Sequence, residues 1–98
     1  MVQVREVFQI HPEHMKEAKA AAKELVVLEQ IKGMGQSRLL TDLTGDYYTL
    51  VLEVECASLA GFEQALTQAV ASPEWAALYG RLRPAIRGGR REIYQIVS

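Results

Sequence analysis

The sequence has one cysteine, one tryptophan and no asparagine among its 98 residues. A single cysteine excludes an internal disulfide, and a chain without disulfides is typical of the reducing cytoplasm. The apolar runs are all much shorter than the roughly 20 residues that span a bilayer, and no basic-then-apolar leader precedes the first strand pattern. We therefore expect a cytoplasmic protein that has no membrane partner and no signal peptide.

Net charge and motifs with known chemistry are also scarce. The formal net charge of -1 offers no whole-molecule attraction to nucleic acid or to an anionic membrane. The sequence contains no nucleophile elbow, no Walker loop, no GxGxxG pattern and no paired CxxC. The usual hydrolase, nucleotide-binding and zinc interpretations are therefore unsupported, and no cofactor is predicted.

The composition is that of a globular domain, which we expect to cover residues 1–98. Hydrophobic residues make up 49% of the chain and charged residues 23%, which argues against disorder. The longest β-rich run is Tyr47–Cys56, whose alternate side chains form one apolar face and one mixed face. A strand of this kind is typical of the centre of a sheet that is covered on both faces.

Hydrophobic periodicity predicts the element order β-α-β-β-α-β. Strands are predicted at 2–10, 37–43, 47–56 and 91–98. Pro12 suits the first turn of a helix because its missing N–H would be unpaired there, and Gly33 suits the end of one. A short turn around Gly45 joins the second and third strands, so these two strands form an antiparallel hairpin.

The second helix is predicted to be split. Ser58 is a good N-cap for its first half, and Ser72, followed by a proline and an acid, begins the second half. Pro84 lies within the apolar pattern of that half and predicts a kink near Gly80. Gly88 and Gly89 are predicted to end this half. The complete pattern predicts the ferredoxin-like arrangement of the α+β class, a four-stranded antiparallel sheet with helices on one face.

The sheet face away from the helices is predicted to be partly apolar. Val7, Leu40, Tyr47 and Val51 would lie on it, with a pair from the last strand. A contiguous apolar patch is unusual on a soluble monomer and marks an interface. We therefore expect a homodimer whose sheets pack face to face. A monomer with a patchy open sheet is the alternative.

Glu6 is the residue most suggestive of a site, because it interrupts the apolar face of the first strand. A carboxylate that faces an apolar layer can act as a base on a bound phenol or enol. Tyr48, Trp75 and Tyr79 would line a pocket with it, and His11 completes the set of pocket candidates. In the alternative interpretation, Glu6 pairs with an arginine and the aromatic residues are ordinary core.

Three other features have simpler interpretations. His11 and His14 could meet one metal ion, but two ligands are too few, so no metal site is predicted. Cys56 ends an apolar face and is expected to be a core thiol. Arginines cluster late in the chain, but the central strand lacks the basic and glycine residues of the RNA-recognition signature, which favours a solvated helix end.

Four segments carry a family resemblance: VQVREVFQI, TDLTGDYYTLVLEVECASLAGFE, the helix start SPEW, and GGRREIYQIV. Through them the chain resembles the small dimeric α/β-barrel proteins, which include antibiotic-biosynthesis-monooxygenase-like and NIPSNAP-like domains. The resemblance implies a homodimer with a cavity between each sheet and its helices. Some relatives oxidise quinone-like aromatics without metal or flavin. Others degrade haem with an Asn-Trp-His set, which cannot be carried over to a chain without asparagine.

These features predict no particular substrate. The leading hypothesis is a homodimeric α/β-barrel protein of unknown activity with a cofactor-free, monooxygenase-like pocket for a small apolar or aromatic molecule. The alternative is a non-catalytic assembly or interaction module. A cavity of several hundred Å³ that contains Glu6 would favour the pocket, whereas a helix–sheet layer packed solid would favour the module.

Overall fold

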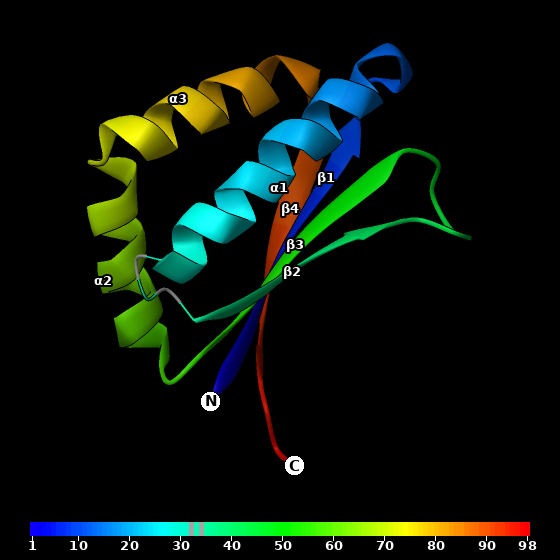
Figure 1. Cartoon of the computed structure of the whole chain (residues 1–98). Coiled ribbons are helices and arrows are strands. Elements are labelled where there is room, and N and C mark those ends of the chain that lie inside the picture. The colour runs from blue at the N-terminus through cyan, green and yellow to red at the C-terminus, as the bar shows by residue number, and fades with distance from the viewer. Residues whose placement is uncertain (32, 34) are drawn as a thin grey trace.

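The computed structural model describes the whole chain except residues 32 and 34 (Figure 1). Its strands are β1 (Val2–Ile10), β2 (Gln36–Thr41), β3 (Thr49–Cys56) and β4 (Ile86–Gln95). Its α-helices are α1 (Met15–Ile31), α2 (Leu59–Val70) and α3 (Pro73–Leu82), and two 3₁₀ turns cover Pro12–His14 and Arg83–Ala85. This order confirms the predicted pattern, including the split second helix.

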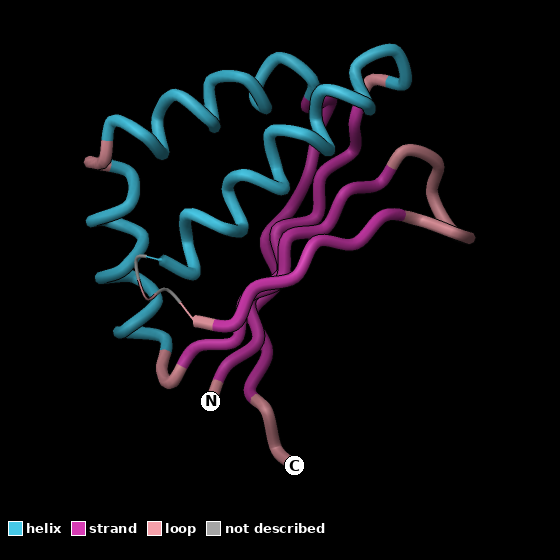
Figure 2. Tube along the Cα trace, in the orientation of Figure 1, coloured by secondary structure: helices cyan, strands magenta, loops and turns pink. Residues whose placement is uncertain are grey.

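The four strands form one antiparallel sheet in the order β2-β3-β1-β4. All the helices lie on one face of the sheet, and the other face is bare (Figures 1 and 2). The register places Glu6 of β1 opposite Leu52 of β3 and opposite Arg91 of β4. The arrangement confirms the predicted ferredoxin-like α+β fold. None of the helices described is long and apolar enough to cross a membrane.

Serine caps fix where α2 and α3 begin. The Ser58 hydroxyl accepts a hydrogen bond from the Gly61 N–H at 3.0 Å, and the Ser72 hydroxyl accepts one from the Trp75 N–H at 3.3 Å. Both satisfy donors that the first turn of a helix leaves unpaired. The predicted effect of Pro84 is wrong, because α3 ends at Leu82 and the proline lies in the 3₁₀ turn that follows.

Strand β4 begins five residues earlier than predicted and contains the two glycines that were expected to end a helix. A Cβ atom on Gly89 would lie 2.5 Å from the carbonyl oxygen of Val7, so only glycine allows β4 to approach β1 this closely. The strand ends at Gln95, and the N–H of Ile96 donates to the carbonyl of Met1 at 3.0 Å.

The β2–β3 hairpin also differs from its prediction. β3 begins at Thr49, because Tyr48 adopts a left-handed backbone conformation with φ of 60° and ends the turn. The Asp42 carboxylate accepts a hydrogen bond from the Thr49 N–H at 2.9 Å, which closes the loop. The turn around Gly45 is as predicted, with φ of 112°.

The core fills the space between the sheet and the helices. Its centre consists of side chains that are almost fully buried, among them Ile10, Leu25, Leu50 and Leu82. A second apolar cluster lies under α2 and contains Val4, Val54 and Phe62. Because these clusters come from β1, β3 and all three helices, the helix-facing side of the sheet is where the chain buries its apolar surface.

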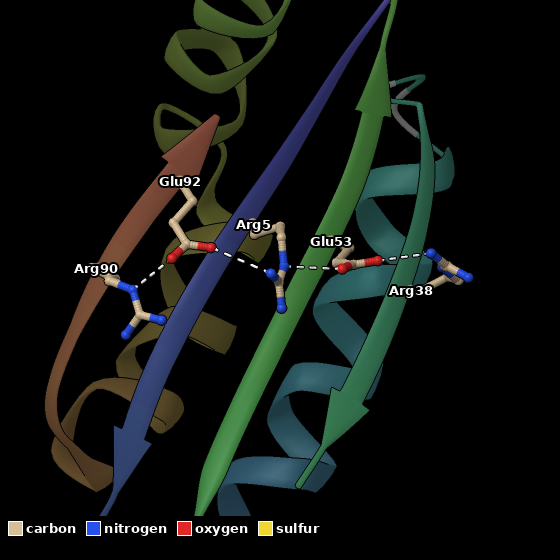
Figure 3. A network of polar contacts seen from close by, with 5 residues as sticks. All are labelled: Arg5, Arg38, Glu53, Arg90 and Glu92. Carbon is tan, nitrogen blue, oxygen red and sulfur yellow. Dashed lines mark hydrogen bonds and ion pairs between the residues drawn. The ribbon is translucent and has the colours of Figure 1, made fainter. Parts of the chain in front are cut away.

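The bare face carries a row of charged side chains that crosses all four strands (Figure 3). We call it the outer charge row; it consists of Arg38, Glu53, Arg5, Glu92 and Arg90. Glu53 binds Arg38 at 2.8 Å and Arg5 at 3.1 Å, and Glu92 binds Arg5 at 3.3 Å and Arg90 at 2.7 Å. Each carboxylate therefore lies between two guanidinium groups.

The apolar part of the bare face is smaller than predicted. Val7 and Val51 are buried within the single chain, because neighbouring side chains of the sheet cover them. Leu40, Tyr47 and Tyr94 remain exposed. The bare face therefore combines a paired charge row with separate apolar side chains.

Candidate functional site

A cavity of about 380 Å³ lies between the sheet and the helices. Every α-helix and three of the four strands contribute to its wall. The lining residues are Glu6, Phe8, Leu25, Glu29, Leu52, Glu53, Val54, Phe62, Leu66, Val70, Trp75, Tyr79, Leu82 and Arg91. A mostly apolar wall with a few convergent polar groups is the usual composition of a small-molecule site.

Glu6 points into the helix–sheet layer from β1 and binds Arg91, its cross-strand neighbour on β4, through an ion pair that is also a hydrogen bond. The Arg91 guanidinium also lies 5.5 Å from the centroid of the Phe62 ring, within the range of a cation–π contact. The Glu6 carboxylate therefore lines the cavity and also pairs with an arginine.

Glu29 is a second carboxylate in the same wall, contributed by α1. Burial raises its pKa to about 7, the nearby negative charge of Glu6 adds to the increase, and the indole N–H of Trp75 opposes it. Burial and a like charge both disfavour the ionised form, so they act in the same direction. Glu29 is therefore poised to gain or lose a proton near neutral pH.

Glu29 was missed in the sequence, although a signal was present. Ala18, Ala22, Leu25 and Glu29 follow at intervals of four, three and four residues, so they share one helix face. The first three are buried in the core. An acid at the next position of a buried apolar stripe is the signal that would have pointed to this residue.

Two aromatic rings from α3 form another part of the wall. The rings of Trp75 and Tyr79 are stacked, with centroids 4.9 Å apart and planes inclined by 10°. The Trp75 Nε1 is buried and makes no well-aligned hydrogen bond within the part of the chain described, although it is near enough to Glu29 to influence that pKa. The indole N–H of Trp75, which lacks a well-aligned acceptor, therefore lies beside the ionisable carboxylate of Glu29 in the cavity wall.

The structure brings Glu6, Trp75 and Tyr79 together but leaves the other two predicted pocket residues outside the cavity. Tyr48 lies in the turn before β3, where its side chain is largely exposed. His11 follows the last residue of β1 and stacks edge-on with His14, with ring centroids 6.2 Å apart. Tyr48 instead lines a separate open depression beside Tyr47 and Arg87. The prediction placed Tyr48 on the inner face because side chains alternate along a strand. The left-handed backbone of Tyr48 places it outside β3, so this alternation does not apply to it.

The described residues contain no group of three histidine, cysteine, aspartate or glutamate side chains placed to hold a metal ion. Cys56 is buried, and burial raises the pKa of its thiol. A raised pKa keeps a thiol protonated and unreactive. The ionisable side chains that the described wall presents to the cavity are the Glu6 and Glu29 carboxylates, the Arg91 guanidinium and the Tyr79 hydroxyl.

Solved structures of similar fold span nearly the whole chain. A NIPSNAP family protein from Agrobacterium tumefaciens superposes with a TM-score of 0.85 at 17% identity, covering 96% of this chain and 90% of that one. An uncharacterized NIPSNAP domain protein from Burkholderia xenovorans gives 0.84 at 15% identity, covering 100% and 96%. An antibiotic biosynthesis monooxygenase gives 0.80 at 19% identity, covering all of both chains.

No family model and no curated protein matches the sequence. At these identities the superpositions establish the fold. The chain has the α+β fold shared by NIPSNAP family proteins and an antibiotic biosynthesis monooxygenase, which confirms at the level of structure the resemblance found in the sequence.

Proposed function

We propose that the cavity binds a small apolar or aromatic molecule carrying an acidic hydroxyl group, and that Glu29 accepts the proton of that hydroxyl. The observation that carries this proposal is the pairing of an ionisable carboxylate with an underused indole donor in a mostly apolar wall. A hydroxyl both donates and accepts hydrogen bonds. It can therefore donate to Glu29 while accepting from the Trp75 N–H.

Proton transfer is the step that the residues support. A general base is most effective when its pKa is near the working pH, and the pKa of Glu29 is about 7. The Trp75 N–H would stabilise the oxygen as negative charge develops on it. The fold is shared with an antibiotic biosynthesis monooxygenase, which supports a monooxygenase-like activity for this cavity.

The emission of Trp75 provides a direct test, because this residue is the only tryptophan. 4-Nitrophenol absorbs in the region of tryptophan emission, so its binding should quench Trp75 in a saturable manner, and its phenolate is yellow. We expect Glu29→Gln to weaken binding about tenfold, since a hydrogen bond to a charged group is lost, and to reduce the bound phenolate. Glu63→Gln, on the exposed surface of α2, is the matched control. Equal binding and ionisation by wild type and Glu29→Gln would refute the role of Glu29.

We further propose that the protein acts as a cytoplasmic homodimer joined through the bare face of the sheet. The helices leave that face open (Figure 1), and Leu40 and Tyr94 are exposed on it to 39% and 53%. The outer charge row is already paired within the chain, so a partner could cover it without leaving either carboxylate unpaired. A protein that forms this dimer but binds no probe in its cavity would instead be the non-catalytic assembly module.

Sedimentation at micromolar concentration tests the homodimer. Leu40→Lys places a charge on the bare face and should convert dimer to monomer. Val27→Lys makes the same change on the exposed side of α1, where Val27 is 56% exposed, and should leave the dimer intact. A monomeric wild type, or equal effects of the two changes, would exclude the bare face as the interface.

A further inference from the structure

The described cavity wall has more acidic than basic side chains, and its arginine is paired with only one of the acids. Arg91 of β4 is the basic residue among the lining residues described, and Glu6 of β1 and Glu29 of α1 contribute acids to the same wall. Glu53 of β3 also contributes to the lining, but its carboxylate binds Arg5 and Arg38 of the outer charge row. The remaining ionisable groups nearby are the hydroxyl of Tyr79 and the buried thiol of Cys56.

Arginine is the side chain that proteins most often use to bind a ligand carboxylate, because its planar guanidinium makes two parallel hydrogen bonds. In this cavity the Nε of Arg91 is occupied by Glu6. The Arg91 side chain is 45% exposed and that of Glu6 is 24% exposed, so the pair lies at an accessible part of the wall. An anionic ligand would have to share the guanidinium with Glu6, whose negative charge already offsets that of Arg91, and would also be repelled by Glu29.

We propose that Glu6 is a positioning residue that sets the charge selectivity of the cavity: by holding Arg91, it makes the site accept uncharged hydroxyl compounds and reject their carboxylate analogues. This inference rests on the proposed function, because it assumes that the cavity is the ligand site. It assigns the two acids different roles. Glu29 contacts the ligand hydroxyl, whereas Glu6 controls which ligands enter by occupying the only basic group of the described lining.

Two probes of nearly equal size separate these roles. 4-Ethylphenol is neutral at pH 7.5 and 4-methylbenzoate is an anion, and calorimetry measures the affinity of both. We expect wild type to bind 4-methylbenzoate at least tenfold more weakly than 4-ethylphenol. In Glu6→Gln the affinity for 4-methylbenzoate should rise at least tenfold relative to that for 4-ethylphenol, because the charge of Arg91 is no longer offset.

The double variant Glu6→Gln/Arg91→Gln is the matched control. It removes both charges of the pair, so it should lose the gain for 4-methylbenzoate relative to 4-ethylphenol. A gain that depends on Arg91 cannot come from a general loosening of the structure, which would affect both probes alike.

The outcomes separate this inference from the proposed function. If wild type binds both probes equally, or if folded Glu6→Gln shows no gain for 4-methylbenzoate, the selectivity role of Glu6 is wrong and the cavity remains a ligand site. If wild type binds neither probe, the proposed function itself fails. The wild-type comparison still decides the question if Glu6→Gln does not fold, which circular dichroism would show.

Discussion

The two faces of the sheet use the same residue types to different ends. On the bare face, three arginines and two glutamates alternate across four strands, and each carboxylate binds two guanidinium groups (Figure 3). On the helix-facing side, Glu6 and Glu29 share the cavity with Arg91, and the arginine binds Glu6. The outer charges are matched, whereas the inner side has an acid in excess among the residues described.

This difference appears in the proton affinities of the acids. Arg90 lowers the pKa of Glu92 on the bare face, through a hydrogen bond and through its charge. Burial and Glu6 raise the pKa of Glu29 to about 7 on the inner side. Paired charges on a sheet surface mainly shape the structure, whereas an unmatched acid in an apolar wall costs stability that only a functional role would justify. The contrast therefore distinguishes a structural charge row from a candidate site.

The largest expected effect is on the free energy of unfolding. A Glu→Gln substitution should stabilise the chain at Glu29, whereas it should destabilise the chain on the bare face. Glu29 has a pKa near 7 when folded and an ordinary value of 4.5, so the unfolded chain loses this proton first. Stability therefore falls as pH rises from about 4.5 to 7, and the full cost, about 3 kcal/mol, is present above pH 7. Glu29→Gln should be more stable than wild type by about that amount at pH 8.

Urea denaturation at pH 8 and at pH 4 measures this effect. At pH 4 the carboxyl is protonated in both states, so the gain from Glu29→Gln should largely disappear. Glu63→Gln, on the exposed surface of α2, should show no such dependence on pH. A Glu29→Gln variant that is less stable than wild type at pH 8 would mean that the carboxylate is compensated, and the contrast between the two faces would fail.

The same substitution on the bare face should act in the opposite direction. Glu53 binds Arg5 and Arg38, and its side chain is 12% exposed. Glu53→Gln should therefore destabilise the chain by about 1 kcal/mol at pH 7, since it weakens two partly exposed ion pairs. Glu55→Gln, two residues along the same face of β3, is the control because the described structure gives its side chain no ion pair. Equal effects from the two substitutions would show that the outer charge row adds no stability.

Much of the fold was readable from the sequence, and the reasons differ by element. Alternation in β1 and β3 and the caps at Ser58 and Ser72 are local signals, so they predicted the strand order and the split helix correctly. Glu6 was noticed because a charge within an apolar alternation is visible in a short window. Which acids pair and which do not depends on strand register, which brings Arg91 to Glu6 across 85 residues.

The failures also have local physical causes. Gly88 and Gly89 were interpreted as helix breakers, because the close approach of β4 to β1 that requires Gly89 is a tertiary contact. Tyr48 was assigned to a strand because its left-handed backbone is unusual for a bulky residue. Glu29 was overlooked because its raised pKa arises from burial in the folded chain and from the charge of Glu6, which is distant in the sequence.

The smallest expected effect concerns one end of the outer charge row. Arg90 is the first cause of the lowered pKa of Glu92, and Arg5 contributes a weaker lowering by its charge. Because the pKa of Glu92 is lower in the folded chain, the stability it contributes is present above its ordinary value of 4.5 and is lost as pH falls through the folded value. Arg90→Gln should move the pKa of Glu92 up toward that ordinary value, but Arg5 should keep it from being reached.

Carbon-detected NMR titration of the side-chain carboxyl of Glu92 measures the shift. Arg83→Gln, outside the outer charge row in the 3₁₀ turn, is the control. A Glu92 titration that is unchanged in Arg90→Gln would show that Arg5 alone holds this carboxylate, and the row would then consist of pairs rather than a connected series.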